Sequence, residues 1–162
     1  MKNTAADSFY GELAPLAVSC GNVNEEKIIL PEPAGLRPRL SELRVALLQL
    51  HKAVIEAERI SYETSFGKIT SPYQFLHLLT SDPWFAWLTP VTHLLAAMDE
   101  MLDAKEAPLT SAGAAELVNR MKTLLVPTEV GEGFSRHFDE ALQRNPDVLF
   151  AHVTLSKLLR TP

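Results

Sequence analysis

Five histidines are the side chains of this 162-residue chain that could most directly bind a metal or transfer a proton. Histidine titrates near neutral pH and is the commonest metal ligand in proteins. The chain contains no Glu-x-x-His pair of the kind that binds di-iron centres in helical bundles, and no His-x-x-x-His or His-Glu-x-x-His zinc motif. A metal site would therefore have to be assembled from residues on separate helices.

Three of the ionisable residues fall on apolar helix faces in the predicted pattern. At 100° per residue, Glu58 lies about 20° and His51 about 40° from Leu47 on one long predicted helix. Asp99 lies about 40° from Leu95 on another. A carboxylate within a core stripe is costly unless it is paired or hydrogen-bonded, so we expect Glu58 to have a partner.

These positions lead to the hypothesis that five side chains converge on one interior polar site. They are His51, Glu58, Tyr62, Asp99 and His152. Such a site would bind a metal or a small ligand, because perturbed ionisable groups cluster at functional sites. The alternative is a set of satisfied polar groups along helix interfaces, since buried polar groups are usually hydrogen-bonded for structural reasons alone. No cofactor is predicted, and a metal ion is the ligand that these residue types would suit.

Three aromatic residues, Trp84, Phe85 and Trp87, form the other unusual concentration in the chain. The helical wheel projects Trp84 with Leu88, which predicts that it anchors the core, with Phe85 and Trp87 to either side. The alternative is a surface that contacts a partner, because tryptophan is enriched at interface hot spots. Exposure of one of the three would favour that alternative.

Composition and missing motifs exclude several function classes. A formal charge of -5 opposes binding to a nucleic-acid backbone, which depends on clustered Lys and Arg. One cysteine excludes an intrachain disulfide framework and a cysteine-based zinc cluster. The apolar runs are far shorter than the roughly 20 residues that span a bilayer. The chain has neither a Gly-x-Ser-x-Gly nucleophile elbow nor a glycine-rich phosphate loop.

Near the N-terminus, an apolar stretch over 13–20 ends at Cys20, in the way that a lipoprotein signal ends at a cysteine. However, Asp7 and Glu12 interrupt the stretch and only Lys2 supplies a positive start, which is the wrong pattern for export. We therefore expect a cytoplasmic protein in which Cys20 is a reduced thiol.

The elements that must position these residues are predicted to be helices. The chain has 25 Leu and 18 Ala against 15 Val plus Ile, and Leu and Ala are the better helix formers. Periodicity and caps predict helices over 38–66, from 72 to about 80, over 83–102, from 111 to about 126, over 130–144 and over 146–160. We thus expect an all-α bundle of five or six helices over 38–162, preceded by an irregular N-terminal arm over 1–37 that is rich in Pro and Gly.

Most of the 11 prolines agree with this assignment. Pro72, Pro83 and Pro146 each follow Ser, Asp or Asn at a predicted helix start, where the missing backbone donor costs least. Pro90 is the exception, because it falls inside the helix predicted over 83–102 and should bend it.

Several strings of the chain resemble a family of uncharacterised bacterial all-helical proteins. They are Leu50-His51-Lys52-Ala53, the stretch 58–63, the Ser71-Pro72 cap, Asp82-Pro83-Trp84-Phe85-Ala86-Trp87-Leu88 and the stretch 141–147. The resemblance covers about residues 38–160, and the Asp-Pro-Trp-Phe-Ala-Trp-Leu string is its most specific part. It implies a bacterial, soluble, helical protein, and it assigns no activity, cofactor or binding residue.

Strong helix signals without a catalytic motif lead us to expect a binding or interaction module. We expect its partner to be another protein or a second copy of the chain, and we expect it to bind neither nucleic acid nor a membrane. The alternative from a different class is a metal- or cofactor-dependent bundle enzyme that uses the interior histidines and carboxylates. The sequence leaves open whether the chain is an enzyme.

Overall fold

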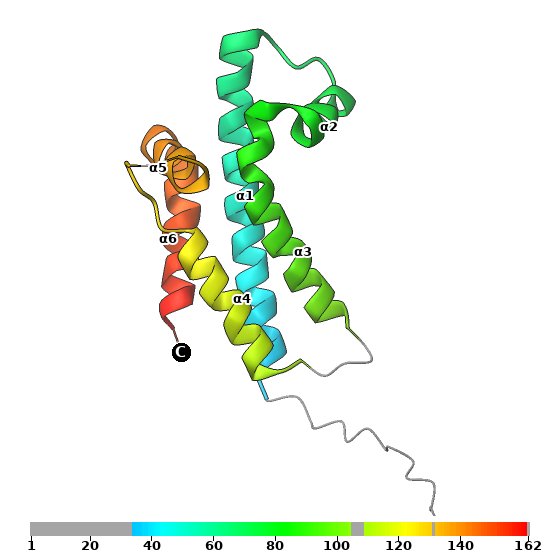
Figure 1. The fold of residues 1–162 in the computed structure, drawn as a ribbon, viewed down its shortest axis with the longest axis vertical. Coiled ribbons are helices and arrows are strands. Elements are labelled where there is room, and N and C mark those ends of the chain that lie inside the picture. The colour runs from blue at the N-terminus through cyan, green and yellow to red at the C-terminus, as the bar shows by residue number, and fades with distance from the viewer. Residues whose placement is uncertain (1–33, 105–108, 131, 162) are drawn as a thin grey trace, which may run out of the picture.

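The fold is a bundle of helices packed on one long helix (Figure 1). A computed structural model describes residues 34–104, 109–130 and 132–161. These residues form α1 (Leu36–Phe66), α2 (Pro72–Ser81), the 3₁₀ helix η1 (Pro83–Leu88), α3 (Thr89–Asp103), α4 (Ser111–Leu124), α5 (Phe134–Arg144) and α6 (Pro146–Arg160), with no strand. The all-α prediction is therefore confirmed, whereas 1–33 of the predicted N-terminal arm lies outside the described residues. Of its last four residues, Leu36 and Arg37 already belong to α1.

Helix α1 is the element on which the bundle is built. It contacts α3, α4, α5, α6 and η1, and Figure 1 shows α3 and α6 on opposite sides of it. Its buried apolar residues recur at intervals of three or four and so form one stripe, which Glu58 extends next to the last of them: Leu40, Leu43, Leu47, Leu50, Val54, Ala57 and Glu58. No helix in the described ranges is both long and apolar enough to cross a membrane.

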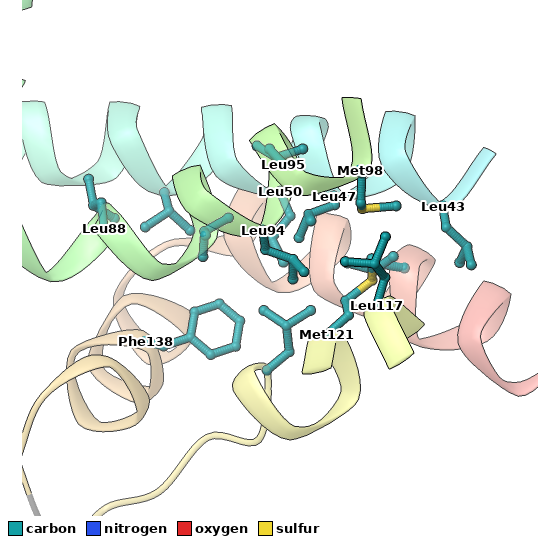
Figure 2. Packing of buried hydrophobic residues seen from close by; sticks show 14 of the residues in the cluster. Leu43, Leu47, Leu50, Leu88, Leu94, Leu95, Met98, Leu117, Met121 and Phe138 are labelled. Atoms are coloured by element: carbon teal, nitrogen blue, oxygen red, sulfur yellow. The ribbon is translucent and has the colours of Figure 1, made fainter. Parts of the chain in front are cut away.

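The core lies between this stripe and the inner faces of the surrounding helices. Figure 2 shows Leu47 and Leu50 of α1 near Leu94 and Met98 of α3. Leu117 and Met121 of α4 and Phe138 of α5 complete the same cluster. Because these side chains are almost fully buried, their apolar area supplies the main driving force for packing the helices together.

The predicted helix caps are present. Four side chains accept a hydrogen bond from a backbone N–H in the first turn of the next helix: Ser71 from Gln74, Asp82 from Trp84, Thr110 from Gly113 and Asn145 from Asp147. Each bond satisfies a donor that has no partner within the helix. The short links between helices are therefore encoded locally.

The single helix predicted over 83–102 is wrong, because the segment contains two helices. A 3₁₀ helix ends at Leu88 and α3 starts at Thr89, so Pro90 lies in the first turn of α3 rather than inside a helix. At that position the missing backbone donor leaves no hydrogen bond unmade. The proline that conflicted with the sequence pattern is thus a second start signal.

The 3₁₀ helix also changes which aromatic residue enters the core. With three residues per turn, side chains three apart lie on one face, so Phe85 and Leu88 are buried together. Phe85 is 1% exposed, whereas Trp84 is half-buried. The wheel of 100° per residue predicted Trp84 as the core anchor; Trp84 packs against the core, but Phe85 is the fully buried residue of the two because the helix is 3₁₀.

Helix α5 begins at Phe134. The prediction that this helix begins at Val130 is therefore wrong. Thr128 Oγ1 donates to the Val130 carbonyl at 3.0 Å and accepts from its N–H at 3.3 Å, which holds that backbone in a turn. Gly133 then takes a φ of 83°, a left-handed conformation that favours glycine and precedes the helix. Val130 is consequently 83% exposed.

The burial of Phe85 predicts a large effect of its removal. Phe85→Ala should lower the free energy of unfolding by about 3–5 kcal/mol, because it deletes a large side chain from a packed core. Tyr73→Ala, at an aromatic side chain that is 84% exposed, should change it by less than about 0.5 kcal/mol. Urea denaturation followed by circular dichroism measures both, and equal losses would contradict the packing described here.

Candidate functional site

Glu58 is the buried carboxylate of the structure, and it has the partner that its position predicts. The residue is 5% exposed, and Arg144 Nη2 donates to its Oε1. Arg144 is the last residue of α5, 86 positions further along the chain. The pair therefore joins α1 to α5, and the charge of Glu58 is compensated within the fold.

Asp99 is paired with Arg44 in the same manner. Arg44 Nε donates to Oδ1, and its Nη2 donates to Oδ2 at 3.1 Å, so both carboxylate oxygens are used. The hydrogen bond from Arg44 holds the pKa of Asp99 below its ordinary value, and the same bond raises the pKa of Arg44. This two-pronged bond connects α1 to α3 at a partly exposed position.

His51 faces α3, where its Nε2 lies 3.4 Å from Thr92 Oγ1. Burial lowers the pKa of His51, because the charged ring would lose its hydration there. The hollow beside it, which Leu50 and Phe138 help to line, measures about 10 Å³. This volume would hold about one water molecule and no organic ligand.

The remaining two candidates, His152 and Tyr62, each pack against aromatic rings, but not against the same ones. The His152 ring meets Phe138 edge-on, with centroids 5.2 Å apart. Burial lowers the pKa of His152, and a hydrogen bond with the Leu125 backbone acts in the opposite direction. Tyr62 packs against Phe66 and Phe85, at centroid distances of 4.8 and 5.4 Å.

The five predicted site residues are therefore not brought to one point. Arg44, which holds Asp99, precedes Glu58 by 14 positions on α1, a separation of about 21 Å along the helix. Among the residues that the structure describes, no group of three or more His, Cys, Asp or Glu side chains could hold a metal ion. The expected shared site does not form among the described residues because the two carboxylates lie at different levels along α1, and each is paired with its own arginine. A ligand-binding role for any one of the five residues stays a prediction.

A larger concave surface lies elsewhere in the described residues, along α3 and α4. It is an open groove of about 1100 Å³. Its apolar lining comes from η1, α3, α4 and the start of α5, and includes Trp87, Pro90, Leu94, Leu124 and Phe134. We call this surface the α3–α4 groove.

Polar side chains also line the α3–α4 groove. They come from both helices and include His93, Glu116, Asn119, Arg120 and Thr123. A second hollow of about 510 Å³ lies between the C-terminal part of α3 and the N-terminal part of α4, and it shares Glu116 and Arg120 with the first. The two hollows together follow the whole length of α4.

Ring contacts hold one wall of the α3–α4 groove in place. Trp87 stacks on His137 with centroids 5.3 Å apart and contacts Phe134 at 5.5 Å. Phe134 in turn stacks on the buried Phe138 at 5.4 Å. Of the three predicted interaction residues, Trp87 is the one that lines the groove, and its side chain is half-buried. Phe85 is in the core, and Trp84 packs among Tyr62 and Phe66.

The α4 side of the groove was missed from the sequence. Its residues include Ala112, Ala115, Asn119 and Thr123, which recur at intervals of three or four and are small or uncharged. On a helix wheel they form an ordinary exposed face. The only available signal was the lack of long charged side chains along most of that face.

Comparisons with protein-family models, with curated proteins and with solved structures found no match to this chain. The resemblance to a bacterial helical family, carried by the string 82–88, therefore stays a prediction. The geometry of the groove is the guide to function.

The Glu58–Arg144 pair predicts an asymmetric response to mutation. Arg144→Ala should lower the free energy of unfolding by about 3 kcal/mol, because it leaves a buried carboxylate without compensation. Glu58→Met, in an Arg144→Ala background, should recover most of that loss. Arg136→Ala is the matched control, since Arg136 is 53% exposed in its pair with Glu140 and should cost less than about 1 kcal/mol. Urea denaturation of wild type and the three variants measures these changes. No recovery of stability in the double variant would contradict the prediction.

Acidification should destabilise the fold through the two half-buried histidines. The pKa values of His51 and His152 are lowered from 6.5 in the folded chain. As the pH falls through about 6.5, the unfolded chain takes up protons first, so stability that is present at higher pH is lost. A His51→Gln/His152→Gln variant should lose less stability than wild type between about pH 7.5 and 5.5. His77→Gln, at an exposed position, should keep the full decline because the two buried rings remain.

Proposed function

We propose that this chain is a binding module that holds an amphipathic helix of a partner protein in the α3–α4 groove. The observation that carries the proposal is the groove itself, an open and largely apolar hollow along α3 and α4 that a few polar side chains also line. Helix-in-groove recognition uses surfaces of this kind.

The shape of the groove favours a helix over a small molecule. Pockets for small ligands measure about 300–1000 Å³ and enclose most of the ligand. This groove has about 1100 Å³, and the hollow of about 510 Å³ adjoins it at Glu116 and Arg120. From Ala112 to Thr123, the α4 side alone extends over about 16 Å, or three helical turns.

The lining indicates the chemistry of the partner. Trp87 and Phe134 offer fixed aromatic surface, which would bury large apolar side chains spaced three or four residues apart. Glu116 and Arg120 lie where the two hollows meet and present opposite charges one helical turn apart. A partner helix with an apolar stripe and one charged residue of each sign at its centre would complement this surface.

Location and origin are part of the proposal. The single cysteine supports a cytoplasmic protein, and the resemblance supports a bacterial one. The net charge of -5 supports a protein partner rather than a nucleic acid. No contact in the described residues favours the alternative of a metal- or cofactor-dependent enzyme.

A displayed library of amphipathic 16-residue helical peptides is the probe for this function. Selected peptides should bind the full chain with dissociation constants of about 1–100 μM, the range of about −8 to −5.5 kcal/mol. Their binding should shift the backbone amide signals of residues 86–94 and 112–124 in NMR spectra. Peptides that bind with the same affinity but shift other regions would overturn the proposal.

Replacing one alanine inside the groove and one outside it with arginine tests whether the peptides bind in the groove. Ala115→Arg places a long charged side chain into the groove from an exposed helical position and should weaken peptide binding by about tenfold or more. Ala96→Arg makes the same change at an exposed position of α3 outside the groove and should leave affinity unchanged. Equal affinities for both variants would count against the α3–α4 groove.

A further inference from the structure

Helix α6 has two apolar faces, only one of which is covered. Val148 and Leu155 on the inner face are fully buried against the bundle. On the outer face, Leu149, Phe150 and Val153 are 45%, 69% and 39% exposed. A helix at the edge of a bundle ordinarily has one apolar stripe and a polar outer face. The second stripe, which we call the outer stripe, therefore needs an occupant.

A groove lies beside the outer stripe, between α6 and α1. It measures about 760 Å³, and its lining includes Val45, Ala46 and Gln49 of α1 with Phe150 and Thr154 of α6. Val45 is itself 49% exposed. The same face of the molecule thus offers a projecting aromatic side chain and an apolar hollow next to it.

The charges on α6 are arranged with opposite signs at its two ends. Asp147 lies in its first turn, and Lys157 and Arg160 lie in its last turn. Within the described residues, none of these three side chains forms an ion pair. An identical helix running in the opposite direction would place each acidic end beside a basic end.

We propose that the outer stripe of α6 is covered by a second copy of the chain, with the two α6 helices antiparallel across a two-fold axis at the level of His152. Asp147 and Lys157 are equally distant in sequence from that level, so Asp147 of each copy lies opposite Lys157 of the other. Phe150 of each copy enters the groove between α1 and α6 of its partner. The proposal is independent of the α3–α4 groove, which lies on other helices.

Self-complementarity is the reason to choose a second copy over an unrelated protein. A two-fold interface uses the same patch on both molecules, so the patch must carry both members of each contact. Here one face carries the aromatic projection and the hollow, and one helix carries the acidic and the basic end. An unrelated partner would need only one member of each pair on this face.

Measurement of molar mass tests the proposal directly. Sedimentation equilibrium of the full chain should give a dimer that dissociates on dilution. Phe150→Asp should raise the dissociation constant by about tenfold or more, because it places a charge in an apolar contact. Tyr73→Asp is the matched control at an aromatic residue of α2 that is 84% exposed, and it should leave the dimer intact. A monomer at all concentrations, or equal effects of the two substitutions, would overturn the proposal.

Charge exchange tests the antiparallel orientation. Asp147→Lys should weaken the dimer, because it sets two positive charges opposite each other at both ends of the interface. Adding Lys157→Asp in the same chain should restore the wild-type dissociation constant. Far-ultraviolet circular dichroism verifies that both variants fold. Failure of the second substitution to restore the dimer in folded protein would exclude this register.

Disulfide trapping tests the position of the axis. In a Cys20→Ser background, Val153→Cys should form covalent dimers when copper and air oxidise the two thiols, because residue 153 lies next to the axis. Val126→Cys, at a valine that is 58% exposed in the link between α4 and α5, is the matched control and should remain largely uncoupled. Equal yields of covalent dimer from the two variants would contradict the proposed interface.

Discussion

The apolar stripe of α1 is the constraint on which the rest of the structure depends. Its buried apolar residues recur every three or four positions from Leu40 to Ala57 of a 31-residue helix, so one narrow surface stays apolar over more than half of its length. Helices α3, α4, α5 and α6 each bury their inner faces against that surface or against one another around it. Because the shorter helices have no other apolar surface of this length to cover, α1 determines where each of them lies.

Two ion pairs connect this stripe to particular neighbours. Arg144 reaches Glu58 from α5, and Arg44 of α1 reaches Asp99 of α3. An apolar contact tolerates sliding, whereas the buried charge of Glu58 has one partner and loses much of its compensation if the helices move. The Arg44–Asp99 pair is partly exposed, and its two hydrogen bonds fix the contact between α1 and α3 by their geometry. The carboxylates that suggested an interior ligand site thus act in the structure as connections between helices, and the concave surface suited to binding lies on the outer side of α3 and α4.

The fold was largely predictable, and the exceptions have local physical causes. Caps at Ser71, Asp82, Thr110 and Asn145 are short-range signals, so helix starts followed from neighbouring residues. The prediction for the segment after Asp82 was wrong because it assumed 3.6 residues per turn, whereas the segment is a 3₁₀ helix with three residues per turn. As a result, Trp84 rather than Phe85 was predicted to anchor the core. The sequence offers no comparable signal for choosing between the two helix types in six residues.

What the sequence by itself determined is the set of helices, the apolar face of each and the need of Glu58 for a partner. All of these depend on spacings within a few turns of one helix. Only the tertiary structure decided that the partner is Arg144, that Trp87 lines a groove and that Phe150 projects from a second apolar face. Each of these depends on which distant helix lies alongside, and that choice arises from packing between segments up to 122 residues apart rather than from any local pattern.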